Sequence, residues 1–249
     1  EVKLLADCRS NMVGNPVRID IREAMPEDAM AIVELMLQAA GDTLQCILDE
    51  LEPRVSASDL FRQMITSIDS ECSYRRCWVA VVPSEAPAPV VGMVNAFPAA
   101  LLCAQGMPSN LTAREIHLWP RTALQEPGSY CINSLAVFPL YRRCGIAGRL
   151  IDHAAKQALS GGFSTLSLHV WEDNVPALTL YRRSGFDIIG RAAIPWHPEL
   201  PFSGDSLLMG LDDLRARTGS ISHCGTALLA AADGERAPIS ARIAQFGEA

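Results

Sequence analysis

The stretch "YRRCGIAGRL", residues 141–150, places two arginines before a run of small residues where a helix is expected to begin. Small residues let the backbone approach a ligand closely, and the first N–H groups of a helix have no partner within it. The positive end of the helix dipole and nearby arginines favour phosphate oxygens. The stretch therefore predicts a phosphate or diphosphate site. Taken alone, it fits a ligand-free strand–turn–helix junction equally well.

Three phosphate-binding patterns can be compared with this stretch. A Walker loop ends in Gly-Lys-Ser/Thr, whereas Gly148 is followed by arginine and leucine. A dinucleotide fingerprint needs G-x-G-x-x-G, and only Gly145 and Gly148 are present. The pattern that remains is R-x-x-G-x-A, formed by Arg142, Gly145 and Ala147.

A second stretch, "NVPALTLYRRSGF" at residues 174–186, has the form N-x-x-A-x-x-L-Y-x-x-x-G-F. The segment before the arginines, "LAVFPLYR", has the form L-x-V-x-P-x-x-R. Together these motifs resemble the GNAT superfamily of N-acetyltransferases. The resemblance is specific over residues 130–191 and extends more loosely, through the order of elements, to about 18–212.

The resemblance implies that acetyl-CoA is the cosubstrate, and we expect no metal. Its pantetheine arm would lie along the strand and contact the backbone of Leu135, Ala136 and Val137. Asn174 would also reach the pantetheine, although its alternative role is a helix N-cap alone. The residues expected at the diphosphate are Arg142, Arg143, Cys144, Gly145, Ile146, Ala147 and Gly148.

For catalysis, the resemblance implies that the Tyr181 phenol protonates the departing CoA sulfur. The alternative is a half-buried tyrosine that only packs. The backbone N–H of Leu135 would polarise the thioester carbonyl. Cys131 and Cys144 flank the expected site without a positioned base, so we expect direct transfer with no acyl-enzyme.

The general base is less well defined by the motifs. Many family members carry a carboxylate at the position of Asn133, which cannot take up a proton. Others use a glutamate five residues before the motif asparagine, and that position is His169 here. A neutral imidazole could serve as the base, or His169 could simply pack in its strand. Further candidates in the long connection are Glu115, His117 and Glu126.

Hydrophobic periodicity and turn residues predict alternating strands and helices. The resemblance implies that they form an α/β (α+β mixed) fold, a single GNAT-like domain with a central twisted, mainly antiparallel sheet and helices on both faces. The expected strands are 17–24, 77–82, 90–98, 130–137, 164–171, 186–192 and 205–211. The expected helices are 26–41, 56–69, a short one within 111–119, 142–162 and 174–185. We expect a poorly ordered N-terminal extension (1–16), the GNAT-like domain (17–213) and a disordered Ala/Gly/Ser-rich tail (214–249).

Composition limits the location and the partners. Residues 142–191 carry six arginines and one lysine against four acidic residues, so this segment is +3 within a chain of net charge −7. Such a local basic segment suits a small polyanion and argues against general nucleic-acid binding. No apolar run approaches the ~20 residues that span a bilayer. The eight cysteines form no C-x-x-C pair and no secretory signal is evident, so we expect reduced cysteines and a cytoplasmic location.

We therefore expect an N-acetyltransferase that moves an acetyl group from acetyl-CoA to a primary amine of a small molecule or peptide. Acidic residues at 42, 49, 50 and 115 hint at a cationic acceptor, or are merely solvated surface. The main alternative is a non-catalytic acyl-CoA-binding regulatory module, and a scaffold that binds no CoA is the third. The sequence leaves the acceptor, the acyl-chain length and the choice between monomer and homodimer open.

Overall fold

The computed structural model describes residues 18–40, 43, 47, 56–83, 88–102, 107, 111–200 and 204–215. The predicted N-terminal extension (1–16) and nearly all of the predicted tail, from residue 216 on, lie outside these described residues.

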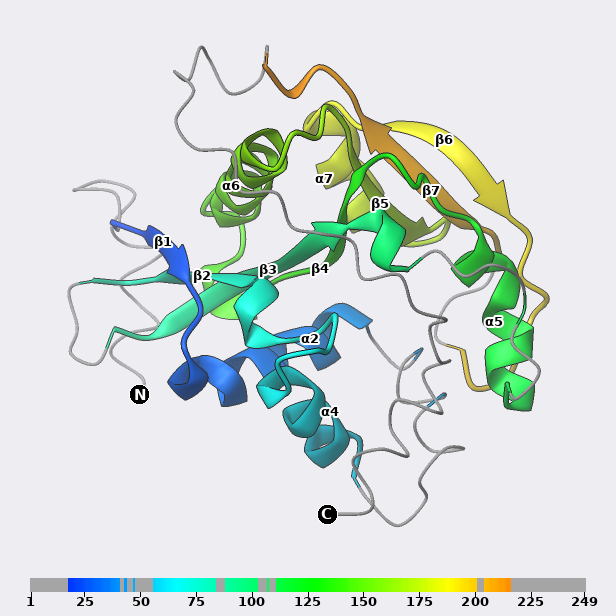
Figure 1. Ribbon diagram of the computed structural model, residues 1–249, viewed down its shortest axis with the longest axis horizontal. Coiled ribbons are helices and arrows are strands. Elements are labelled where there is room, and N and C mark those ends of the chain that lie inside the picture. Colours follow the sequence, from blue (N-terminus) through cyan, green and yellow to red (C-terminus); the bar gives the residue numbers. More distant parts are fainter. Residues whose placement is uncertain are drawn as a thin grey trace.

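A seven-stranded sheet forms the centre of the domain, with strand order β1-β2-β3-β4-β5-β7-β6 (Figure 1). Its strands are β1 (Asp20–Glu23), β2 (Cys77–Val81), β3 (Val90–Pro98), β4 (Tyr130–Val137), β5 (Leu166–Trp171), β6 (Asp187–Ala192) and β7 (Ser206–Leu211). Neighbouring strands are antiparallel except β4 and β5, which are parallel. The predicted mainly antiparallel sheet is confirmed.

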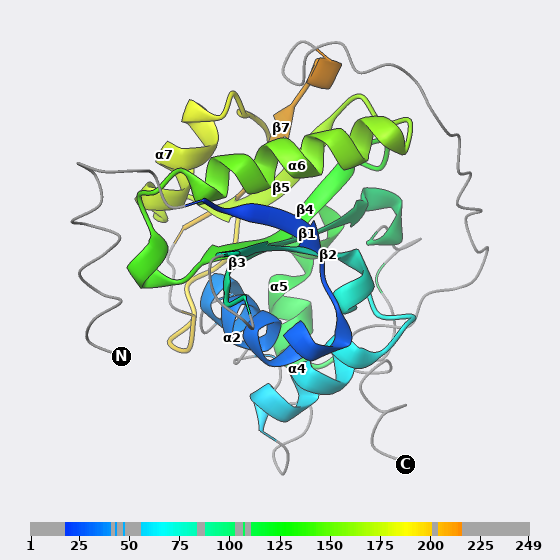
Figure 2. The same cartoon turned by 90° about the vertical axis from the view of Figure 1, so that its left-hand side faces the viewer.

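Helices cover both faces of the sheet, also as predicted. Figure 2 shows α6 and α7 on one face and α2, α4 and α5 on the other. The α-helices are α2 (Ala29–Ala40), α4 (Ala57–Thr66), α5 (Ala113–Ala123), α6 (Ile146–Ser160) and α7 (Val175–Arg183). Short 3-10 turns are η2 (Pro26–Asp28), η3 (Tyr74–Arg76), η4 (Ala99–Leu101) and η5 (Pro139–Tyr141).

The apolar stripe of α6 lies on the core, as its spacing predicted. Its members are Ile146, Leu150, Ile151, Ala154 and Ala158, and all of them are buried. Alanines on the inner face let the helix approach the sheet closely, and this packing fixes the helix start at the end of β4.

The 3-10 turn η2, which leads directly into α2, is held by the carboxylate of Asp28. Asp28 Oδ2 accepts a hydrogen bond from the Met25 amide at 2.8 Å, and both carboxylate oxygens accept from the Arg22 guanidinium at 2.6 and 2.9 Å. Burial alone would raise the pKa of Asp28, but the bonds from Arg22 and Met25 outweigh it, and the pKa is lowered. This pair ties β1 to the helix that follows it.

One helix is shorter than its periodicity predicted. The stripe of α4 buries Phe61 and Ile65, but Ile68 lies beyond the helix end and is exposed. Ser67 adopts extended backbone angles, and the Thr66 hydroxyl donates to carbonyls of the last turn, which ends the helix. Among the helices that the structure describes, none is both long and apolar enough for a bilayer crossing.

Candidate active site

Strands β4 and β5 separate part-way along their length and leave a fork. Their parallel pairing runs from Tyr130 opposite Leu166 to Ile132 opposite Leu168. From there β5 stays paired with β7 as far as Trp171, while β4 continues along β3. Among the described residues, no strand therefore pairs with residues 133–137 on the β5 side of β4.

The register of β3 and β4 decides which backbone groups face this fork. Phe138 N donates to Val91 O at 3.0 Å. This bond flanks the pair of Val137 and Gly92, so these two residues do not hydrogen-bond to each other. Bonded and non-bonded pairs alternate along antiparallel strands. Ala136 is therefore bonded to β3, whereas the polar backbone groups of Leu135 and Val137 point into the fork.

The loop after β4 has the backbone shape of an anion cradle. Arg143 and Gly145 both have positive φ, at 67° and 76°, and left-handed residues of this kind turn successive N–H groups toward one point. The first bond of α6 joins Arg149 N to Gly145 O at 3.2 Å. The six amides of 143–148 donate to no residue in the part of the chain that the structure describes.

Space above the loop is open, and arginines lie beside it. A Cβ built on Gly145 or Gly148 would meet no atom within 4 Å. Arg142 Nε donates to Val137 O at 3.1 Å, which holds this exposed side chain at the end of the fork. Free amides, open space and positive charge fit a diphosphate. Arg149 lies elsewhere, because its guanidinium donates to the Ile19 carbonyl.

Asn174 begins α7 as its N-cap. Its Oδ1 accepts a hydrogen bond from the Ala177 amide at 3.2 Å, which confirms the capping role. The side-chain NH₂ takes no part in the cap, so it is the group left to reach a ligand. Its predicted contact with pantetheine stays a prediction.

Tyr181 lies on α7 and packs against the α6-side core, with its ring edge on Phe186 at a centroid distance of 5.8 Å. Burial raises the pKa of its phenol to about 12. The hydroxyl has no hydrogen-bond partner among the described residues. The phenol is therefore protonated at every physiological pH and its O–H is available to an acceptor atom.

A β-bulge puts Asn133 where the fork opens. Asn95 lies opposite Ser134 and Ala96 opposite Ile132, so Asn133 is the extra residue in β4. Its Nδ2 donates to Asn95 Oδ1 at 2.9 Å.

The orientation of Asn133 follows from the buried Asn95 behind it. Asn95 Nδ2 donates to the Glu71 and Arg76 carbonyls, each at 3.1 Å, and these acceptors allow only one orientation of its amide. Asn95 therefore presents Oδ1 to Asn133, and Asn133 donates to it through its NH₂ group. The Oδ1 of the exposed Asn133 is left as an acceptor at the fork.

His169 lies beside the fork on the α5 face of the sheet. Its Nε2 is 2.6 Å from the Leu124 carbonyl, which can only accept, so Nε2 carries the proton and Nδ1 is the basic nitrogen. Burial and the nearby positive charge of Arg121 lower the pKa of His169 to about 3. The imidazole is neutral and a weak base. Its role as general base stays a prediction.

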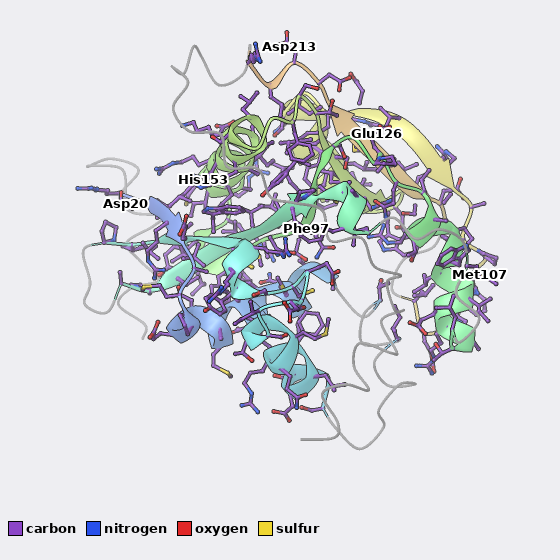
Figure 3. All side chains as sticks on the ribbon, viewed as in Figure 1. Asp20, Phe97, Met107, Glu126, His153 and Asp213 are labelled. Carbon is purple, nitrogen blue, oxygen red and sulfur yellow. The ribbon has the colours of Figure 1, made fainter. Side chains whose placement is uncertain are left out.

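Two of the three other proposed bases have structural partners. Glu115 forms a capping box with Thr112, at 2.9 and 3.2 Å, that begins α5. His117 Nε2 contacts the Pro195 carbonyl at 2.9 Å. Glu126 is exposed in the loop between α5 and β4 (Figure 3).

The site cysteines differ in exposure. Cys131 is buried in β4, and Cys144 is exposed in the loop with its thiol near the Arg142 carbonyl at 3.6 Å. Within the described ranges, no group of three or more His, Cys, Asp and Glu side chains could hold a metal ion.

Residues 44–186 match the acetyltransferase (GNAT) family. This segment is more than half of the chain. The protein belongs to the GNAT acetyltransferase family. That assignment places it among the acyltransferases and agrees with the fork, the loop and the order of elements described above.

Solved structures show the same fold. An N-acetyltransferase from Staphylococcus aureus Mu50 is 19% identical, with a TM-score of 0.55 over 77% of this chain and 100% of its own. Another acetyltransferase is 22% identical, with a TM-score of 0.52 over 78% of this chain and 99% of its own.

In this GNAT domain, two residues near the site, Asn95 and Arg121, belong to none of the sequence motifs. Asn95 interrupts the apolar run of β3, and a lone polar residue in a buried strand was a usable signal. Arg121 follows Pro120 within α5, a helix that runs on through the proline to Ala123 beyond its predicted end. Nothing in the local sequence marks Arg121.

Proposed function

We propose that this protein is an N-acetyltransferase that moves an acetyl group from acetyl-CoA to a primary amine of a small molecule or peptide by direct attack. The observation that carries the proposal is the set of free amides at residues 143–148, beside a strand whose fork side is unpaired. The catalytic domain would span residues 17–213.

Acetyl-CoA would bind through its diphosphate and its pantetheine arm. The diphosphate would accept from the amides of 143–148, with Arg142 and Arg143 adding charge. The pantetheine would run beside β4, where Leu135 and Val137 offer backbone groups and Asn174 offers its NH₂.

Two hydrogen-bond donors would stabilise the negative charge that develops on the thioester during transfer. The Leu135 N–H would bond the carbonyl oxygen, whose negative charge grows as the amine attacks. The Tyr181 O–H would donate to the departing sulfur. A thiol has a pKa near ~8.5, below that of this phenol, so the hydrogen bond itself stabilises the sulfur charge before the proton moves.

The attacking amine would be oriented by Asn133, whose Oδ1 accepts one of its hydrogens. Because His169 is so weak a base, it would not deprotonate the amine. The amine would therefore lose its proton to water first and enter the site in its neutral form. The pH at which kcat/KM stops rising should then follow the pKa of each acceptor. A base on the enzyme would give one fixed value for all acceptors.

The direct test is release of CoA thiol over a panel of amines, aminoglycosides, polyamines and peptide N-termini. At least one acceptor should give turnover. Rapid mixing with acetyl-CoA alone should give no burst of CoA and no acylated protein, because transfer is direct. A stable acyl-enzyme would contradict direct attack.

The alternative, an acyl-CoA-binding regulatory module, is favoured by one pair of observations. Asn133 cannot take up a proton, and the pKa of His169 is about 3. The module predicts CoA binding in a calorimetric titration with no release for any acceptor and no effect of Tyr181→Phe. The scaffold alternative predicts no CoA binding in the same titration.

A further inference from the structure

Arg121 lies on α5, and Figure 2 shows α5 on the face of the sheet opposite α6. Arg121 Nη1 donates to Ser206 Oγ at 2.8 Å, and its Cζ lies 5.6 Å from the centre of the Trp171 ring. Ser206 and Trp171 are both buried and pair with each other across β7 and β5. The guanidinium is therefore fixed near the end of β5, where the fork is open.

No carboxylate among the described residues forms an ion pair with Arg121. At this end of the sheet, Arg114 pairs with Glu199, and Arg191 pairs with Glu172 and Asp205. Arg121 makes no ion pair with any described residue. Burial lowers its pKa to about 10, which still leaves it charged at neutral pH. The half-buried guanidinium donates to one hydroxyl among the described residues, so its other N–H groups are available to a ligand.

The field of Arg121 reaches both strands of the fork. Its charge lowers the pKa of His169 on β5, and it interacts electrostatically with Cys131 on β4. The diphosphate loop lies at the start of α6, on the other face. An acceptor that approaches the fork from the α5 side would therefore meet Arg121 first.

We propose that the acceptor amine carries a carboxylate and that Arg121 binds it. The guanidinium uses one of its five N–H groups on Ser206, and a planar fork of two further N–H groups matches the two oxygens of a carboxylate. Trp171 and Ser206 hold the guanidinium in one orientation before the acceptor arrives. The inference rests on the proposed transfer to an amine, and it replaces the cationic acceptor suggested by the acidic residues.

The test compares amino carboxylates with their own carboxamides, which keep the shape and remove the charge. Glycine, leucine and 6-aminohexanoate are each paired with the corresponding amide, and kcat/KM is measured by CoA release. The carboxylate should be preferred about tenfold or more, because a hydrogen bond to a charged group contributes about 1.5–3 kcal/mol.

Two variants show whether Arg121 causes the preference. Arg121→Met should abolish it and leave CoA affinity unchanged, and a thermal melt checks that the variant is folded. Arg18→Met is the matched control, since Arg18 lies before the edge strand β1 and is largely exposed. The control should keep the full preference.

A binding experiment distinguishes failure of this inference from failure of the proposed function. N-acetyl-leucine and its amide are titrated calorimetrically into the wild type and into Arg121→Met. A wild type with no preference for the carboxylate, or a preference that survives Arg121→Met, overturns the inference while CoA release still supports the enzyme. If no acceptor releases CoA, the proposed function fails, and the titration alone decides the role of Arg121.

Discussion

Asn133 donates a 2.9 Å hydrogen bond to Asn95 across the bulge in β4, and this contact determines which atom Asn133 turns to the fork. Asn95 cannot rotate its amide without losing two carbonyl partners, so Asn133 Oδ1 stays directed outward. In the proposed reaction, a residue that cannot act as a base would therefore accept a hydrogen bond from the amine.

Asn133→Ala should lower kcat/KM for the acceptor about tenfold, since about one hydrogen bond to the amine is lost. CoA affinity should change little, whereas Tm should fall, because the Oδ1 of the buried Asn95 loses its donor on Asn133. Steady-state kinetics with acceptor varied, beside a CoA titration, gives both numbers. Unchanged acceptor kinetics would remove Asn133 from the site.

Tyr181→Phe should reduce kcat about 100-fold while KM for acetyl-CoA stays the same, because only the donor to the departing sulfur is lost. With a phenol pKa of about 12, Tyr181 should cause no fall in wild-type activity up to about pH 10. Tyr74→Phe, on η3, is the matched control and should retain wild-type kcat. Equal rates for the two variants would contradict the assignment.

Gly148→Ala should stabilise the free protein and weaken CoA binding at the same time. Alanine is favoured over glycine inside a helix by about 0.5–1 kcal/mol, and the new Cβ meets no atom of the described residues within 4 Å. The methyl group would fill the space left for the diphosphate, so Kd should rise about tenfold to a hundredfold. Thermal melts and calorimetry test both parts, with Gly128→Ala as a control outside the loop.

The buried His169 should make stability depend on pH. Its pKa is about 3 when folded and near ~6.5 when unfolded, so the unfolded chain binds the extra proton between these values. The contribution of His169 is complete above pH 6.5 and is lost as pH falls, by about 1.4 kcal/mol at pH 5.5. Urea unfolding of the wild type and of His169→Gln should show a smaller pH dependence in the variant. Equal dependence in both proteins would mean that His169 titrates normally.

Motifs with local causes were predictable. The glycine and arginine pattern of the loop, the Asn174 cap and the stripe of α6 each depend on residues close in sequence, and the structure has them as expected. The order of helices and strands along the chain was also predictable, because turn residues and alternation marked nearly every element.

The bulge at Asn133 and the surroundings of Arg121 could not be predicted, because they depend on contacts between segments that are distant in the sequence. The bulge at Asn133 is set by the register against β3, and the partners of Asn95 lie 19 and 24 residues away. Arg121 contacts Trp171 and Ser206 only because α5 packs over β5 and β7. No spacing within one segment carries that information.

The central claim concerns the six backbone amides of residues 143–148, and an NMR titration of ¹⁵N-labelled protein observes them directly. With CoA added, their resonances should shift strongly; with pantetheine, which has no diphosphate, they should stay in place while Leu135 and Val137 still respond. Resonances of 143–148 that remain unmoved by saturating CoA would contradict the account.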